Sequence, residues 1–267
     1  MRRSQETKKW LIAGGAVAAA LIALGIYLYI ERKAAPPPAA ETAAETQPVE
    51  QQPQAHYPVP ETTPAPEEAP LPALDDSDPA VLDELVRTLG DGAGEVLVPD
   101  SIVRRIVATV DGLSRPKLAV RMRPVVPVRG AFVVEERDGT TVLGEQNYAR
   151  YAPLVQLVQA ADTSQIVALY YRFYPRFQEA YEQLGYPDAY FNDRVVAAID
   201  DVLATPDAQG PIQLTRPRVF YEFVDPDLES RSVGQKVLLR IGPENAAVIR
   251  QKLREIRREI TSHVPQA

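Results

Sequence analysis

Apolar residues recur every three or four positions through most of the chain after residue 70, which is the spacing of amphipathic helices. The stripes predict helices over residues 79–89, 102–110, 166–184, 188–204, 226–241 and 243–262. The third stripe continues through Pro175, so we expect one long helix that is kinked at this proline. Gly242-Pro243 separates the last two helices, because glycine ends helices and proline starts them. We interpret Gly90–Gly94 as a loop between two helices.

The helical spacing is interrupted in two places by short runs that alternate or are rich in β-formers. Residues 131–135 and 140–143 flank Asp138-Gly139, a pair that favours a two-residue hairpin turn. Residues 212–214 and 219–224 resemble two further short strands. The sequence therefore predicts a mainly α fold with minor β structure, in a single globular domain.

An uncharged apolar segment, Trp10–Ile30, precedes this domain. As a helix its 21 residues would measure about 32 Å, close to the roughly 30 Å hydrocarbon core of a bilayer. Residues 1–9 carry four cations, whereas only Arg32 and Lys33 follow closely, and such a bias keeps the leader in the cytoplasm. We expect a single transmembrane helix with the C-terminal domain in the periplasm. A cleaved signal peptide is the alternative, but signal peptides have shorter apolar cores and end in small residues.

The 39 residues Ala34–Pro72 hold 11 of the chain's 25 prolines and six glutamates, without lysine or arginine. Such a composition cannot bury enough apolar surface to offset the entropy of ordering. We therefore divide the chain into a leader (1–9), a transmembrane helix (10–30), a disordered tether (31–72) and an extracytoplasmic domain (73–267). The tether is interpreted as a spacer, and a proline-rich ligand for a partner is the alternative.

Composition excludes several chemistries. The chain has no cysteine, and its two histidines, His56 and His263, lie in the tether and near the end. No thiolate nucleophile, Ser-His-Asp arrangement, cysteine site or histidine-rich zinc site is expected, and we predict no cofactor and no metal. The net charge of −7 provides no electrostatic footprint for nucleic acid.

Two segments supply candidate binding residues. The first is Asn147-Tyr148-Ala-Arg150-Tyr151, since tyrosine and arginine are enriched at binding hot spots, although a helix start whose tyrosines cover the core is the ordinary explanation. The second holds the carboxylates of Glu222, Asp225 and Glu229.

Each carboxylate of the second segment has a structural alternative. Glu222 lies within a strand-like apolar run, where it either faces outward or is buried beside a partner such as Arg150. Asp225 is placed to cap a helix that begins at Pro226. A calcium loop over this segment would need glycine at 230 and glutamate at 236, where the chain has Ser230 and Lys236.

The last predicted helix carries Arg250, Arg254, Arg257 and Arg258 away from its apolar face. A solvated basic face is the ordinary interpretation of this pattern, and a surface for an anionic partner is the alternative.

Three strings carry a family resemblance: NYARY from Asn147, YPRFQEAYEQLGYPDAYFNDRVVAAIDDVL from Tyr174, and YEFVDPDLESRSVGQKVLLRIGPENA from Tyr221. They resemble the uncharacterised bacterial family called domain of unknown function 3014, over roughly residues 71–260. The resemblance implies a single-span anchor and a proline-rich tether, and it implies no activity, cofactor or catalytic residue.

Two functional hypotheses follow. The first is a non-enzymatic interaction or scaffold module, anchored in the inner membrane and presented in the periplasm to an envelope protein or a cell-wall partner. The alternative is a carboxylate-dependent glycan hydrolase of the cell wall, which would need two carboxylates about 5–10 Å apart across a cleft.

Overall fold

The structure is a computed structural model that describes residues 57–60 and 70–262. The described part of the chain is mainly helical, with two small antiparallel hairpins, in one globular domain. Its elements are η1 (Leu74–Asp76), α2 (Asp78–Leu89), α3 (Gly92–Val96), α4 (Ile102–Leu113), η2 (Val120–Met122), β1 (Val134–Arg137), β2 (Thr140–Leu143), α5 (Gln146–Ala149), α6 (Ala152–Ala160), α7 (Thr163–Gln183), α8 (Phe191–Leu203), β3 (Leu214–Thr215), β4 (Glu222–Phe223), α9 (Pro226–Glu229), α10 (Val233–Arg240) and α11 (Pro243–Ile260).

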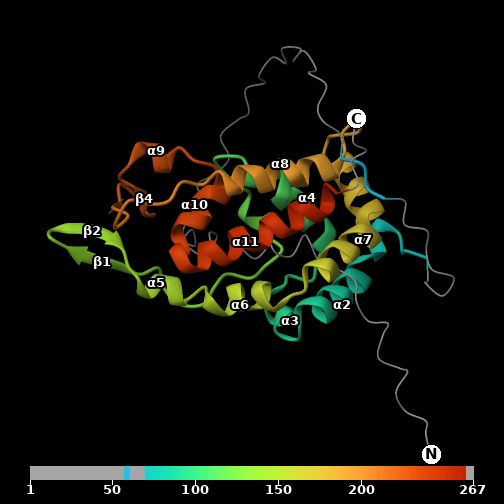
Figure 1. Cartoon of the computed structure of the whole chain (residues 1–267), viewed down its shortest axis with the longest axis horizontal. Helices are drawn as coiled ribbons and strands as arrows, with labels where there is room; N and C mark the ends of the chain where they lie inside the picture. The colour runs from blue at the N-terminus through green and yellow to red at the C-terminus, as the bar shows by residue number, and fades with distance from the viewer. Residues whose placement is uncertain (1–56, 61–69, 263–267) are drawn as a thin grey trace, which may run out of the picture.

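A bundle of helices forms the larger part of the molecule. Helix α11 crosses its middle, with α8 along one side and α6 along the other, while α4 packs against α7 and α8 (Figure 1). The residues spaced by three and four face inward, so that Ile106, Phe177, Ile249 and Ile256 are fully buried. Burial of each such side chain stabilises the fold by roughly 1.5–3 kcal/mol.

An aromatic cluster joins α7 to α8. The ring of Tyr170 lies 5.9 Å from that of Phe177 and 6.5 Å from that of Phe191, measured between centroids. The Tyr170 hydroxyl donates a 3.0 Å hydrogen bond to the amide oxygen of Asn192, and burial raises the pKa of Tyr170 well above its usual value. As predicted, α7 is one helix that continues through Pro175.

The strands gather at the opposite end of the molecule from α7 (Figure 1). The predicted hairpin is confirmed as β1 and β2, and its turn places Asp138 (φ 50°) and Gly139 (φ 74°) in the left-handed region. Strand β3 pairs with β4, and a single bridge between Val142 and Gln213 joins the two hairpins. We call β1–β4 with α9 the β lobe. A second, smaller core lies beneath it and comprises Leu143, Ile212, Leu214, Phe223 and Leu239.

Two predictions about helices were wrong. The helix expected over 226–241 is divided into α9 and α10, because the Ser232 side chain accepts a 3.2 Å hydrogen bond from the backbone N–H of Gln235 and so starts a new helix. Residues 90–94 were expected to be a loop, but α3 begins at Gly92. Complete burial of Ala93 against the bundle offsets the low helix propensity of the glycines.

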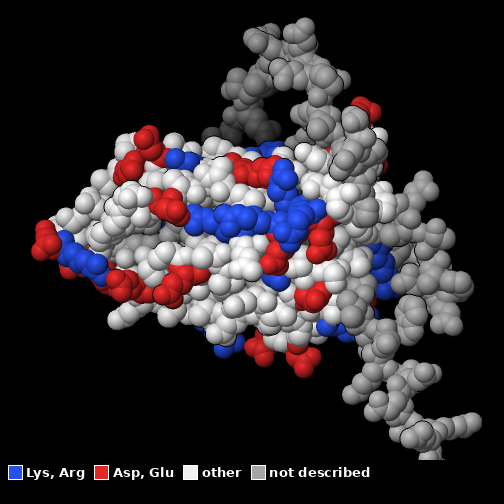
Figure 2. All heavy atoms as spheres, viewed as in Figure 1, with Lys and Arg blue, Asp and Glu red and all other residues white. Residues whose placement is uncertain are grey.

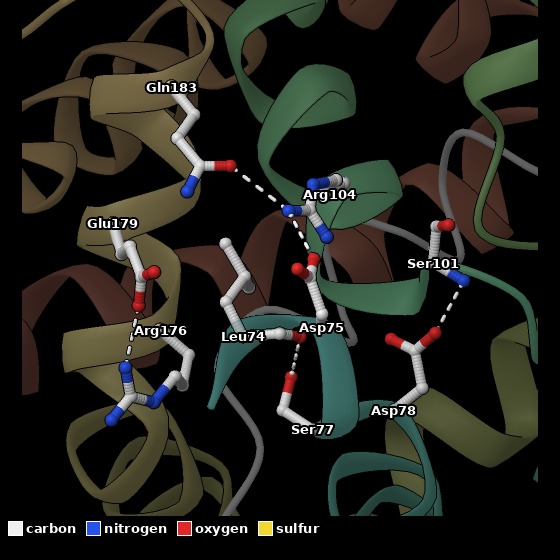
Figure 3. Close-up of polar contacts among 9 residues, drawn as sticks. All are labelled: Leu74, Asp75, Ser77, Asp78, Ser101, Arg104, Arg176, Glu179 and Gln183. Atoms are coloured by element: carbon white, nitrogen blue, oxygen red, sulfur yellow. Dashed lines mark hydrogen bonds and ion pairs between the residues drawn. The ribbon is translucent and has the colours of Figure 1, made fainter. Parts of the chain in front are cut away.

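Asp75 of η1 and Asp78, the first residue of α2, hold the N-terminus of α4 (Figure 3). The carboxylate of Asp78 accepts a 2.6 Å hydrogen bond from the backbone N–H of Ser101, which has a left-handed φ of 54°. The guanidinium of Arg104 contacts Asp75 at 2.7 Å and the Gln183 amide oxygen at 3.0 Å. These contacts hold α2, α4 and α7 together on the surface above their apolar packing.

No helix in residues 57–60 and 70–262 is long and apolar enough to cross a membrane. The predicted leader and transmembrane helix, residues 1–30, lie outside the described residues. Of the predicted tether, residues 57–60 and 70–72 are described, and Tyr57, Val59 and Leu71 pack against the bundle core.

Candidate functional site

The segment Asn147–Tyr151 connects the β lobe to the bundle. The amide of Asn147 is fully buried, and its oxygen accepts hydrogen bonds from the Arg150 guanidinium at 2.6 Å and from the backbone N–H of Val133 at 3.4 Å. Its amide nitrogen donates to the carbonyl oxygen of Arg240 at 3.4 Å. Asn147 therefore joins three segments that are distant in the sequence.

Arg150 and Tyr151 complete this junction. The guanidinium of Arg150 also donates to the carbonyl oxygens of Arg129 at 3.3 Å and Gly130 at 2.9 Å, and it lies 5.5 Å from the centroid of the Tyr151 ring. Tyr151 is fully buried, and burial raises its pKa, an effect that the neighbouring Arg150 charge opposes. The junction is therefore stabilised by Asn147, Arg150 and Tyr151. The fourth residue, Tyr148, lines the groove described below.

The three candidate carboxylates do not form one cluster. Glu222 is exposed on β4, opposite Thr215 of β3. Asp225 caps α9 as expected, since its carboxylate accepts a 2.8 Å hydrogen bond from the backbone N–H of Asp227. Arg150 is engaged at the junction described above, and the structure does not pair it with Glu222.

Glu229 forms an ion pair that joins the β lobe to α10. One carboxylate oxygen accepts a 2.8 Å hydrogen bond from the backbone N–H of Phe223, and the other lies 3.0 Å from the ammonium of Lys236. Lys236 is only 5% exposed, and its ammonium also donates to the Glu229 carbonyl oxygen. A calcium loop would need a glutamate at residue 236. The chain has Lys236 there, and its ammonium neutralises the carboxylate of Glu229.

A surface groove of about 800 Å³ lies where the β lobe meets α11. Its apolar lining includes Leu143, Tyr148, Ile212 and Leu239. The ring of Tyr148 lies directly over Gly242, so close that a Cβ at residue 242 would be 2.4 Å from it. Glycine at 242 is therefore required both by its φ of 88° and by the place of Tyr148.

Four of the five charged residues that line the groove form ion pairs. Arg250 contacts the carboxylate of Asp207 at 2.9 Å, and Arg137 contacts Glu145 at 3.1 Å. Partial burial raises the pKa of Tyr148, and the charges of Glu145 and Glu135 raise it further. A hydrogen bond from Arg137 lowers the pKa of the Glu135 carboxyl. An apolar groove bordered by ion pairs suits the binding of a segment that carries both apolar and polar side chains.

Arginines form a band along the exposed side of α11 (Figure 2). Arg257 binds the carboxylate of Asp200 through two nitrogens, at 2.5 and 2.9 Å, and Arg250 pairs with Asp207. Arg254 and Arg258 are exposed. Two of the four cations predicted to form this face are therefore neutralised by acidic neighbours.

Sequence reasoning identified Tyr148 but missed the groove beside it, because the groove is formed by three segments that no local pattern connects. Within residues 57–60 and 70–262, no group of three or more His, Asp or Glu side chains is placed to hold a metal ion.

Comparison with known proteins gives a family match, which covers the candidate segments and the groove. No curated protein and no solved structure matches this chain. The sequence profile of one family, described as Protein of unknown function (DUF3014), matches residues 102–257. This match spans α4 to α11 and includes both candidate segments and all the residues that line the groove. The chain belongs to the DUF3014 family.

Proposed function

We propose that this protein is anchored in the inner membrane by Trp10–Ile30 and presents its DUF3014 domain in the periplasm as a non-enzymatic interaction module. The uncharged length of this segment and the four cations before it support the anchor and its orientation. The partner would be an envelope protein or a cell-wall component.

The groove beside Tyr148 is the observation that carries the binding role. It has the volume of a ligand-sized cleft, an apolar lining and a tyrosine held in place by Gly242. Both of its arginines, Arg137 and Arg250, are already paired with carboxylates, so a partner segment would gain apolar contact without having to neutralise an isolated cation. We therefore assign partner binding to this groove.

The alternative, a glycan hydrolase, is not favoured by the surroundings of its candidate carboxylates. Asp225 caps a helix and Glu229 is neutralised by Lys236, while Glu222 is exposed on a strand. A glycan hydrolase of this kind needs two carboxylates that face each other across a cleft, and none of these three residues lines the groove.

Crosslinking in intact cells tests the groove. A photoreactive residue at Ala208, which is exposed and lines the groove, should capture a partner. Ala149→Trp, which fills the groove from α5, should abolish that capture. Ala197→Trp, at an exposed position of α8 outside the groove, should leave it unchanged. Equal capture by both tryptophan variants would contradict binding in the groove.

Topology is tested separately. A reporter that is active only in the periplasm, fused after Ala267, should be active. If only a reporter that requires the cytoplasm is active, the proposed orientation is wrong.

A further inference from the structure

Four residues of the proline-rich region lie against the domain, where Tyr57 contacts Asp193 of α8, 136 positions further along the chain. Residues 57–60 are all partly buried, and Tyr57 and Val59 pack against the core of the bundle. In Figure 1 this stretch is the short blue segment beside the end of the bundle at which α8 begins.

Both backbone groups of Tyr57 are held by neighbouring side chains of α8. The N–H of Tyr57 donates a 2.7 Å hydrogen bond to the carboxylate of Asp193. Its carbonyl oxygen accepts a 3.0 Å hydrogen bond from the amide nitrogen of Asn192. A contact of this kind fixes the direction and the register of the segment, because it uses a donor and an acceptor of one residue.

The receiving side chains are themselves fixed in place. Asn192 is fully buried, and its amide oxygen is held by the Tyr170 hydroxyl, so its nitrogen is oriented toward Tyr57. Arg257 of α11 lies near the Tyr57 side chain: a hydrogen bond to Asp200 raises the pKa of Arg257, and Tyr57 contributes to the same shift. The Tyr57 side chain also packs against the core of the bundle, so the surface contacts the tyrosine side chain as well as its backbone.

Two prolines keep the segment extended before it binds to this surface. Pro58 and Pro60 fix their own φ angles and restrict Tyr57 and Val59, which precede them, to extended conformations. An extended segment that is already ordered loses less entropy on binding.

We infer that α8 and α11 form a peptide-binding site for a Tyr-Pro-Val-Pro segment, and that residues 57–60 of the same chain occupy it. Only nine residues, 61–69, separate the segment from Pro70, so occupation within one chain is favoured by a high effective concentration.

Occupation of the site limits how far the domain can lie from the membrane, a consequence that rests on the proposed anchor. With residues 57–60 bound, residues 31–56 connect the membrane to the domain, and these 26 residues span at most about 90 Å. If the segment were released, the 42 residues 31–72 would span at most about 145 Å. Binding therefore shortens the distance over which the domain can act.

Peptide binding to the full-length chain in detergent micelles tests the site. The probe is a fluorescent peptide of residues 54–62, QAHYPVPET, followed by anisotropy. Tyr57→Ala should vacate the site, and this variant should bind the peptide at least tenfold more tightly than the unchanged chain, in which residues 57–60 compete. A peptide with alanine in place of tyrosine should not bind.

A second substitution identifies the surface. Asp193→Ala, added to Tyr57→Ala, should abolish peptide binding, because Asp193 accepts the Tyr57 N–H. Asp188→Ala is the matched control, since Asp188 is an exposed carboxylate just before α8.

Three results would overturn the inference: no peptide binding to Tyr57→Ala, equal binding by the unchanged chain, or binding that survives Asp193→Ala. None of them bears on membrane topology or on capture in the groove.

Discussion

The helical bundle and the β lobe are stabilised by different interactions. The bundle has a large apolar core in which aromatic side chains of α7 pack against α8. The β lobe has a core of only five buried apolar residues, and cations cover its aromatic rings. The guanidinium of Arg240 lies 4.7 Å from the centroid of the Phe223 ring, and that of Arg216 lies 5.4 Å from the Tyr221 ring.

This difference bears on function because the groove lies between the two regions. Its α11 side is part of the rigid bundle, whereas Leu143 and Ile212 belong to the β lobe. A lobe with few apolar contacts opens at lower free energy than a bundle core. We therefore expect substitutions in the lobe to change the groove before they unfold the molecule, and substitutions in the bundle to unfold everything together.

Alkali should have the largest effect, and it acts on the bundle. Burial raises the pKa values of Tyr171, Tyr174 and Tyr181 to about 12, while the unfolded chain has tyrosine pKa values near 10. The folded state therefore binds more protons between pH 10 and 12, and stability falls as the pH rises through this window. Each pKa unit of a fully buried group corresponds to about 1.4 kcal/mol, and solvent screening reduces this figure for the partly buried hydroxyls, so we expect the three tyrosines together to lower stability by several kcal/mol.

Absorbance at 295 nm and circular dichroism, recorded together from pH 9 to 12.5, measure this effect. Tyr171, Tyr174 and Tyr181 should ionise in one step that coincides with loss of helix. Ionisation of these three tyrosines near pH 10 with the helices intact would contradict their buried environment.

Phe177→Ala should destabilise the bundle by about 3–5 kcal/mol, because it leaves a cavity against Tyr170 and Phe191. Denaturant unfolding should remain a single transition, shifted for the whole domain. Leu184→Ala, at a position that is 43% exposed, is the control and should change stability by about 0.5 kcal/mol or less. A loss restricted to the β lobe would contradict the expectation that substitutions in the bundle unfold the whole domain together.

Glu229→Ala should destabilise the β lobe by about 1–3 kcal/mol. It leaves the ammonium of Lys236 and the backbone N–H of Phe223 without their acceptor. Hydrogen exchange should increase in β3, β4 and α9, with little change in α7 or α8. Asp227→Ala, an exposed carboxylate of the same helix, is the control. An equal increase in hydrogen exchange in every element of the domain would mean that the lobe does not open separately.

The same contrast explains what the sequence predicted. The long periodic helices α4, α7 and α8 were found because one buried face determines each pattern, and the Asp138-Gly139 turn identified the first hairpin. The break between α9 and α10 was missed, although Ser232 and Gln235 form a helix-start signature.

The groove and the peptide-binding site had no such signal. The groove depends on Gly242 being close to Tyr148, and the second site on Tyr57 reaching Asn192, 135 residues away. Local propensity says nothing about contacts of this range. The candidate residues were therefore found by type, and only the structure separates Tyr148, which lines a groove, from Tyr151, which fills the core.

The smallest effects concern Arg150 and Glu222, which the sequence allowed to be a buried pair. Arg150→Ala removes hydrogen bonds to two carbonyl oxygens and to Asn147, at a partly exposed position, so we expect a loss of about 1 kcal/mol. Glu222→Gln changes an exposed side chain and should alter stability by less than about 0.5 kcal/mol. Because the two side chains belong to separate contacts, the double variant should show the sum of the single effects. Thermal melts of the three variants measure this, and a coupling above about 0.5 kcal/mol would show that the two residues interact after all.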